Sequence, residues 1–116
     1  MNIEDIRDYC LGFAGVTESF PFGEDTLVFK VMGKMFCLLN IETKEFVNLK
    51  CDPVKAIELR ELHQAIKPGF HMNKKHWNSV YMDGSLSNAF LQGLIDHSYN
   101  LVVQSLPKKD QQQLAK

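Results

Sequence analysis

The chain has 116 residues, of which 45% are apolar and 23% charged, and its formal net charge is −1 at pH 7. This length predicts one domain with a core of its own. The charge balance excludes a strongly basic nucleic-acid-binding protein and leaves room only for a local basic face. The sequence has no apolar run that could span a membrane and no signal-peptide pattern, so we expect a cytoplasmic protein.

The three cysteines, Cys10, Cys37 and Cys51, lack the C-x-x-C spacing of many metal and redox sites, and their number is odd. Each lies among apolar residues, which is typical of small buried thiols in a reducing compartment. We therefore expect neither disulfides nor cysteine metal ligands.

The first predicted element is an amphipathic helix over residues 3–14, where apolar side chains recur at helical spacing. Asn2 suits the N-cap position, and Asp5 lies in the first turn, where a carboxylate favours the helix dipole. Gly12 and Gly15 are expected to end this helix.

Three strands are then predicted at the spacing of a meander, over residues 26–31, 34–41 and 46–51. Met32-Gly33 predicts a tight turn between the first two, and such short connections require antiparallel pairing. In this register Lys30, Asn48 and Lys50 lie on the face opposite the core, whereas a slip of one residue would reverse the faces.

Two further helices and a fourth strand are predicted in the second half of the chain. Asp52-Pro53 is typical of a helix start, and this helix is expected to end near residue 63. Residues 77–82 alternate as a strand, and the last helix is expected over about 87–105, after a serine cap at Ser85 or Ser87. Its wide apolar arc indicates a helix that is deeply buried or that meets a partner.

These elements form one expected domain over residues 1–106, followed by a polar, frayed tail over residues 107–116. We expect an α+β fold in which helices pack on an antiparallel meander sheet. The predicted core residues are Phe29, Phe36, Leu38, Leu49, Leu94 and Val102.

The segment from Pro68 to Met82 holds the only tryptophan and two of the four histidines. No carboxylate occurs between Glu61 and Asp83, although several lysines do. Lysines bind phosphate as point charges, and asparagine bonds to phosphate or to a base edge. The candidate nucleic-acid-binding residues are Lys30, Lys34, Lys50, Lys67, His71, Asn73, Lys74, Lys75, His76 and Trp77.

Several segments, in this order along the chain, together resemble the MmcQ/YjbR family: Pro21-Phe22-Gly23, Leu27 to Val31, Gly33 to Phe36, Leu49 to Pro53, Pro68 to Trp77, Asp83-Gly84 and Ser98-Tyr99. The resemblance covers about residues 3–106. It implies an antiparallel meander sheet packed against N-terminal, middle and C-terminal helices, similar to the bacterial frataxin fold. It also implies a proposed DNA-binding role.

Two features of the candidate surface have alternative interpretations. Trp77 is either a core residue at the start of a strand or a platform on which a base stacks. The lysines are either a phosphate-binding face or the solvated surface of a sheet and a loop.

The sequence gives little support for metal binding or for catalysis. His71 and His76 are separated by two lysines, whose charge opposes a bound dication. The similarity to frataxin suggests an acidic ridge that binds iron, but the acidic residues that could form it are few and spread along the chain: Glu4, Asp5, Asp8 and Glu18. The sequence has no nucleophile motif and no phosphate-binding loop. A catalytic pair of Cys37 with a histidine is the one arrangement that the sequence does not exclude. We expect no enzyme, no metal and no cofactor.

We therefore expect a small binding protein that contacts DNA weakly, mainly through phosphates, by means of a local basic face. The alternative is a protein-interaction or regulatory module that uses the apolar last helix or an aromatic loop and has no nucleic-acid role. In either case we expect a monomer without a membrane partner.

Overall fold

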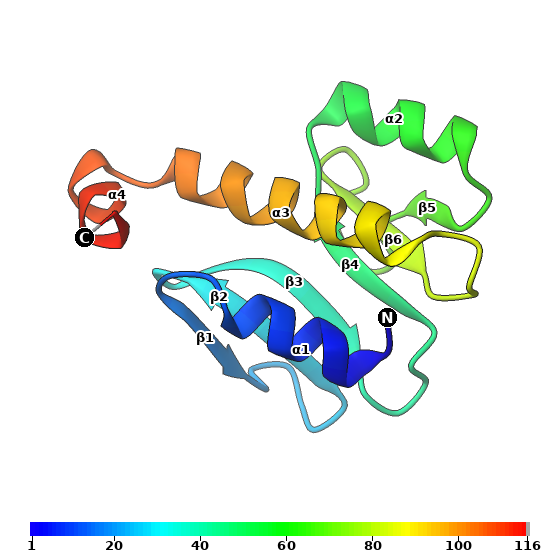
Figure 1. Cartoon of the computed structure of the whole chain (residues 1–116), viewed down its shortest axis with the longest axis horizontal. Helices are drawn as coiled ribbons and strands as arrows, with labels where there is room; N and C mark the ends of the chain where they lie inside the picture. Colours follow the sequence, from blue (N-terminus) through cyan, green and yellow to red (C-terminus); the bar gives the residue numbers. More distant parts are fainter. Residues whose placement is uncertain (116) are drawn as a thin grey trace.

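The computed structural model describes residues 1–115 and contains one antiparallel sheet in the order β1-β2-β3-β4-β6-β5 (Figure 1). The strands are β1 (Val16–Ser19), β2 (Thr26–Val31), β3 (Lys34–Asn40), β4 (Phe46–Lys50), β5 (Ile66–Pro68) and β6 (Trp77–Tyr81). The helices are α1 (Ile3–Leu11), α2 (Pro53–Leu62), α3 (Asn88–Ser105) and α4 (Lys108–Leu114). Among residues 1–115, no helix combines the length and apolar character needed to cross a membrane.

The predicted α+β fold is confirmed, and the local signals in the sequence mark its elements closely. Asn2 and Asp5 form a reciprocal capping box at α1, which ends at Leu11, earlier than predicted. The side chains of Asp52 and Ser87 cap α2 and α3 by accepting a hydrogen bond from a backbone N–H of the first turn. Strands β3, β4 and β6 each end one residue earlier than predicted.

Three short elements were not predicted. Strands β1 and β5 flank the sheet, and four or three residues are too few to show an alternating pattern. Helix α4 occupies most of the expected frayed tail, because Leu114 turns back and packs against the main core. Lys116, the last residue of that predicted tail, lies outside the described residues.

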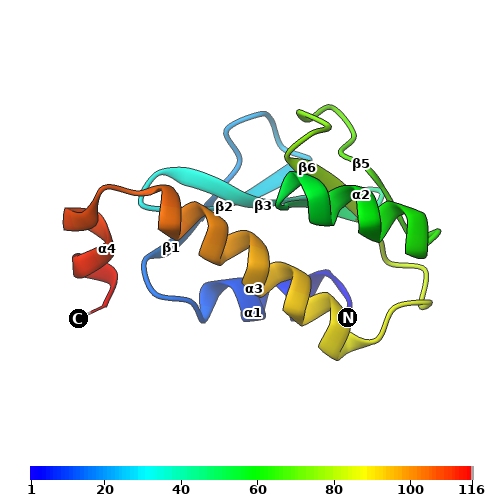
Figure 2. The same cartoon turned by 90° about the horizontal axis from the view of Figure 1, so that it is seen from above.

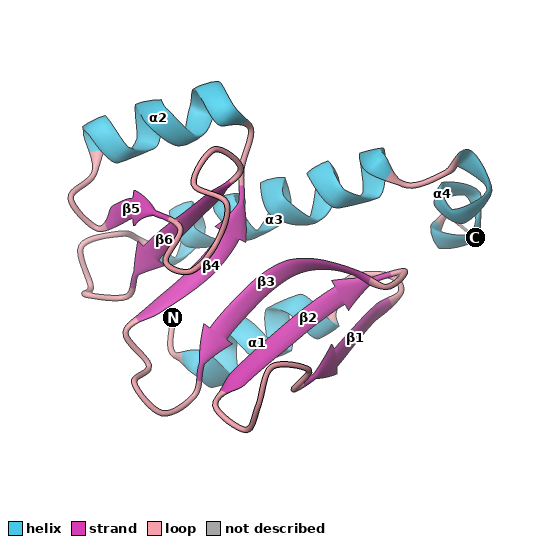
Figure 3. Ribbon diagram, turned by 180° about the vertical axis from the view of Figure 1, so that it is seen from behind, coloured by secondary structure: helices cyan, strands magenta, loops and turns pink. Residues whose placement is uncertain are grey.

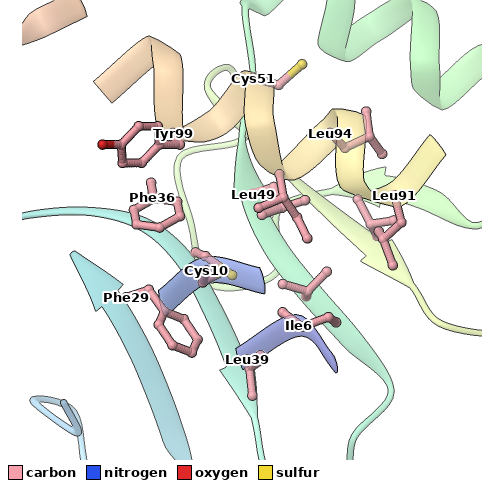
Figure 4. Packing of buried hydrophobic residues seen from close by; sticks show 14 of the residues in the cluster. Ile6, Cys10, Phe29, Phe36, Leu39, Leu49, Cys51, Leu91, Leu94 and Tyr99 are labelled. Atoms are coloured by element: carbon pink, nitrogen blue, oxygen red, sulfur yellow. The ribbon is translucent and has the colours of Figure 1, made fainter. Parts of the chain in front are cut away.

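The main core lies between one face of the sheet and helices α1 and α3, which cover that face in Figure 2. Figure 4 shows Cys10 of α1 close to Phe29, Ile6 of α1 close to Leu39, and Tyr99 beside Phe36. All six predicted core residues are buried. Leu38, however, belongs to a smaller cluster on the opposite face, with Val28 and Trp77. Each fully buried large apolar side chain contributes about 1.5–3 kcal/mol relative to exposure.

Strands β3 and β4 pair only through the middle of their length, from Cys37–Leu49 to Leu39–Val47. Beyond that pairing they diverge toward the start of β3 and the end of β4 (Figure 3). The hydroxyl of Ser98 on α3 lies in this opening, where it donates to the Phe36 carbonyl and accepts from the Lys50 N–H. The helix thus supplies the hydrogen bonds that the two strands do not make with each other.

We expect Ser98→Ala to lower the free energy of unfolding by about 1–3 kcal/mol, because it leaves buried backbone groups without partners. Ser98 has no exposed surface. Ser105→Ala is the control, since the Ser105 hydroxyl is on an exposed residue and bonds within its own helix, to the Val102 carbonyl. Urea unfolding measures both variants, and equal losses for the two would contradict this role of Ser98.

Candidate functional site

The loop between β5 and β6, residues 69–76, crosses in front of the sheet face opposite α1 and α3 (Figure 3). Two buried side chains hold it there. The Phe70 N–H donates to the Ser79 hydroxyl (2.9 Å), and the Phe70 carbonyl accepts from the Asn48 amide (3.2 Å). The Ser79 hydroxyl in turn donates to Asn48 Oδ1, so the two side chains and the loop backbone form a closed ring of hydrogen bonds.

Gly69 begins the loop at a point of close contact. A Cβ at this position would lie 2.8 Å from the Trp77 Cβ and 2.9 Å from the Trp77 carbonyl oxygen, both closer than real Cβ contacts allow. The Lys74 ammonium donates to the Gly69 carbonyl (2.9 Å) and thereby ties the middle of the loop to its start. Arg60 of α2 donates to the Lys74 carbonyl (2.6 Å) and to the Asn78 side chain (2.8 Å). The loop is thus fastened to the sheet and to α2.

The six predicted lysines lie at or near one end of the sheet, and we call this surface the lysine end. Lys67 lies farthest from that end of the sheet, because it is opposite the middle of β6. Antiparallel pairing brings the end of β2, the start of β3, the end of β4 and the start of β6 to this end. Lys50 pairs with Trp77, and Lys67 pairs with Ser79. Lys30 and Lys34 lie on the β2–β3 hairpin, across the opening from Lys50. The remaining two, Lys74 and Lys75, lie in the 69–76 loop.

The loops at the other end of the sheet carry acidic residues, namely Glu24, Asp25, Glu42, Glu45 and Asp83. Within residues 1–115 the only ion pair closer than 4.0 Å joins Arg7 to Glu18. None of the six lysines therefore has a carboxylate partner in the described chain. Asp52, which follows β4 at the lysine end, accepts the N-terminal hydrogen bond of α2 from Lys55 N. Charge is thus distributed unevenly along the strand direction, although Lys44 lies in one of the acidic loops and Asp52 lies at the lysine end.

Trp77, which was predicted as part of the basic surface, belongs to the core instead. Trp77 is 7% exposed and packs with Val28, Leu38 and Met72, so its ring has no open face on which a base could stack. The core interpretation of Trp77 is therefore correct and the stacking interpretation is wrong.

Asn73 organises a turn within the loop. Its carbonyl accepts from His76 N (3.2 Å) and Trp77 N (3.0 Å), and its side-chain oxygen accepts from Lys75 N (2.9 Å). His76 is half-buried, and its carbonyl accepts from Cys51 N (2.8 Å). His71 is exposed, with φ of 59°, a left-handed conformation that non-glycine residues adopt at some cost.

A groove of about 600 Å³ opens on the same sheet face, between the 69–76 loop and the acidic loops. Leu38 and Asn48 lie on the strands beneath it, and Phe22, Phe46 and Phe70 contribute aromatic rings. The rings of Phe46 and Phe70 meet edge to face, with centroids 5.8 Å apart and planes at 85°. The volume lies within the range of small-molecule sites. His71 and Asn73, predicted as part of the basic surface, line this groove instead.

The sequence analysis missed the groove. Its aromatic residues come from three separate segments, and each was compatible with a core position. The sequence held one sign of the groove, namely a polar residue, Asn48, in the middle of a mostly apolar strand. A buried asparagine there marks a polar network, which only the fold reveals.

The chemistry-bearing side chains elsewhere are in structural roles. Burial raises the pKa of the Cys37 thiol well above its ordinary value, and a hydrogen bond with Cys10 adds to this effect. A neutral, buried thiol is a poor nucleophile. Of the residues considered for an acidic ridge, Glu18 pairs with Arg7 and Asp5 caps α1. Within the described residues no three potential metal-ligating side chains of histidine, cysteine or acidic type lie together.

His97 of α3 lies beside the start of α2, where its Nε2 accepts from the Asp52 N–H (3.2 Å). Burial lowers the pKa of His97, and the Lys55 ammonium lowers it further, while the Asp52 carboxylate acts in the opposite direction. The neutral imidazole is the form that accepts this hydrogen bond. Protonation of His97 therefore removes a contact between α2 and α3.

We expect Gly69→Ala to destabilise the protein by about 1–3 kcal/mol, because the added methyl group overpacks the contact with Trp77. Gly93→Ala is a matched control with the opposite expected sign. Gly93 is on the exposed side of α3 and a methyl group added there would meet no atom within 4 Å, so alanine should stabilise the helix by about 0.5–1 kcal/mol. Thermal unfolding compares the two, and a neutral Gly69→Ala would contradict the close contact.

Stability should also depend on pH through His97. Because its pKa is lower in the folded protein than in the unfolded chain, its contribution is complete above about pH 6.5 and decreases as the pH falls. We expect His97→Asn, which keeps a hydrogen-bond acceptor but does not titrate, to lose less stability than the wild type between neutral and acidic pH. Parallel pH-dependent urea unfolding curves for the two proteins would exclude this contribution.

Comparison with known proteins agrees with this architecture. A model of the YjbR family matches residues 11–101. The uncharacterised Escherichia coli O157:H7 protein YbdF is 47% identical over 96 residues, covering 82% of this chain and 79% of that protein. The uncharacterised Escherichia coli K12 protein YjbR is 34% identical over 110 residues, covering 94% and 93%.

Solved structures show the same fold. The crystal structure of Deinococcus radiodurans protein DR2400, described by domain DUF419, has a TM-score of 0.91 and 38% identity, and covers 98% of this chain and 88% of that one. A Pseudomonas syringae crystal structure has a TM-score of 0.74 and 27% identity, with coverage of 87% and 98%. The chain belongs to the YjbR family.

Proposed function

We propose that this protein binds nucleic acid through the lysine end of its sheet and has no catalytic activity of its own. One observation carries the proposal. Six lysines gather at or near one end without a carboxylate partner among residues 1–115, while the acidic loops lie at the opposite end. A phosphate chain at the lysine end therefore meets ammonium groups that no carboxylate within 4.0 Å already neutralises.

The contacts at this surface are mainly electrostatic. Lys67 and Lys75 are exposed and their ammonium groups make no hydrogen bond within the described chain, so both are free to neutralise phosphates. Lysine contacts to phosphate position a protein on DNA but carry no sequence information. With a formal net charge of −1 there is little long-range attraction. We therefore expect weak binding without strong sequence preference.

The alternative of a protein-interaction module has less support from the surface it was expected to use. The apolar arc of α3 is buried, including Leu91, Leu94, Ile95, Tyr99 and Val102, so this helix presents no broad apolar face to a partner. The alternative is supported only by the exposed aromatic residues of the β1–β2 loop, Phe20 and Phe22.

A salt titration of DNA affinity tests the proposal. We expect binding of a fluorescent duplex to weaken steeply with salt, with the logarithm of affinity falling by about 0.9 per neutralised phosphate for each decade of salt. The double variant Lys67→Gln, Lys75→Gln should flatten this slope by about 1.8 if both side chains contact phosphates. Lys74 is kept in the test protein because its ammonium group holds the loop through the Gly69 carbonyl.

The control is Lys108→Gln, Lys109→Gln on α4, which removes the same amount of charge from two exposed lysines that are not among the six. Fluorescence anisotropy measures all three proteins. The control should keep the wild-type slope. Coincident slopes for the two double variants, or no salt-dependent binding by the wild type at low ionic strength, would rule out the lysine end as a DNA-binding surface.

A further inference from the structure

The groove beside the 69–76 loop has a character of its own, separate from the lysine end. Its volume of about 600 Å³ is suited to a small molecule. No lysine or arginine lines it, and Glu45 is its only carboxylate. The charge of the groove is therefore opposite to that of the surface proposed for nucleic acid, so the groove should bind a different kind of ligand.

Three phenylalanine rings at the groove are more exposed than such rings usually are. Phe22 and Phe70 are 65% and 53% exposed, and Phe46 is half-buried against Phe70. Phe46 and Phe70 meet edge to face, nearly at right angles, and we call this pair of rings the aromatic corner. Exposed apolar side chains that gather at one concavity mark a binding site more often than isolated ones do.

The charge of the lining points to the sign of the ligand. The face of an aromatic ring attracts a cation through its quadrupole, and a carboxylate nearby adds to that attraction. Glu45 has no ion-pair partner within residues 1–115, and Glu42 and Asp25 lie on the loops at the same end of the sheet. An anion in this groove would meet the uncompensated Glu45 carboxylate.

The buried side of the groove adds one polar anchor. Asn48 is 7% exposed, and its amide donates one hydrogen bond, to the Phe70 carbonyl. A primary amide carries two N–H groups, and the second has no acceptor among residues 1–115. Most of the remaining contact surface there is apolar, from Leu38 and Met72. A ligand with an apolar body fits this side, and its charged head fits the aromatic corner and Glu45.

We propose that the groove binds a small organic cation in which an ammonium group is attached to an aryl or alkyl body. The apolar body lies over Leu38, and the ammonium lies near Glu45 and the rings of Phe46 and Phe70. This function goes beyond nucleic-acid binding and uses a different part of the same sheet face.

Three probes of similar shape test the sign of the charge: phenethylamine is the cation, 2-phenylethanol is neutral and 3-phenylpropionate is the anion. Amide chemical shifts of the full chain, followed by two-dimensional NMR, give both the affinity and the location. We expect shifts around residues 45–48 and 70–73, and an affinity for the amine about tenfold or more above that for the acid.

Matched variants test the two parts of the site. Glu45→Gln should reduce amine affinity several-fold toward that of the alcohol, whereas Glu42→Gln, in the same loop but outside the lining, should change it less than about twofold. Phe22→Ala should weaken binding, whereas Phe20→Ala, which removes an exposed ring outside the lining, should not.

Three outcomes would overturn the proposal: equal or tighter binding of the acid, equal effects of the two glutamate variants, or no shifts at the groove with any probe. The variants of the lysine end, Lys67→Gln and Lys75→Gln, should bind phenethylamine as the wild type does. Failure of DNA binding would therefore leave this test unaffected, and failure here would leave the DNA test unaffected.

Discussion

The ring of hydrogen bonds among Asn48, Ser79 and the Phe70 backbone is the constraint on which both candidate surfaces depend. Buried polar groups are costly unless each finds a partner, and here a loop and two strands satisfy one another. The ring holds the 69–76 loop against the sheet. One part of that loop then forms a wall of the groove, and another carries Lys74 and Lys75.

The antiparallel sheet explains how one small domain presents two surfaces of opposite charge. Adjacent strands alternate in direction, so side chains near the end of β4 and near the starts of β3 and β6 come together at the lysine end of the sheet. The acidic loops lie at the other end. The opening between β3 and β4 widens the lysine end, and Ser98 makes that opening possible by satisfying the Phe36 carbonyl and the Lys50 N–H.

Much of the architecture could be read from neighbouring residues. The Met32-Gly33 turn has positive φ at both residues, as a two-residue hairpin turn of type I′ requires. Alternation correctly placed Lys30 and Lys50 on the face opposite the main core, because a strand repeats every two residues. The same logic failed for β1 and β5, whose few residues cannot establish a period, and for α4, which is held by the contact of Leu114 with the core.

The helix caps, the turns, the faces of the central strands and the YjbR family could all be predicted from the order of residues, because each depends on neighbours along the chain. The fold was needed to establish that Trp77 is buried, that Asn48 fastens a loop, and that Phe22, Phe46 and Phe70 line one groove. Hydrogen-bond rings and grooves are made by residues far apart in sequence. Their side-chain types are compatible with several positions until the fold brings them together.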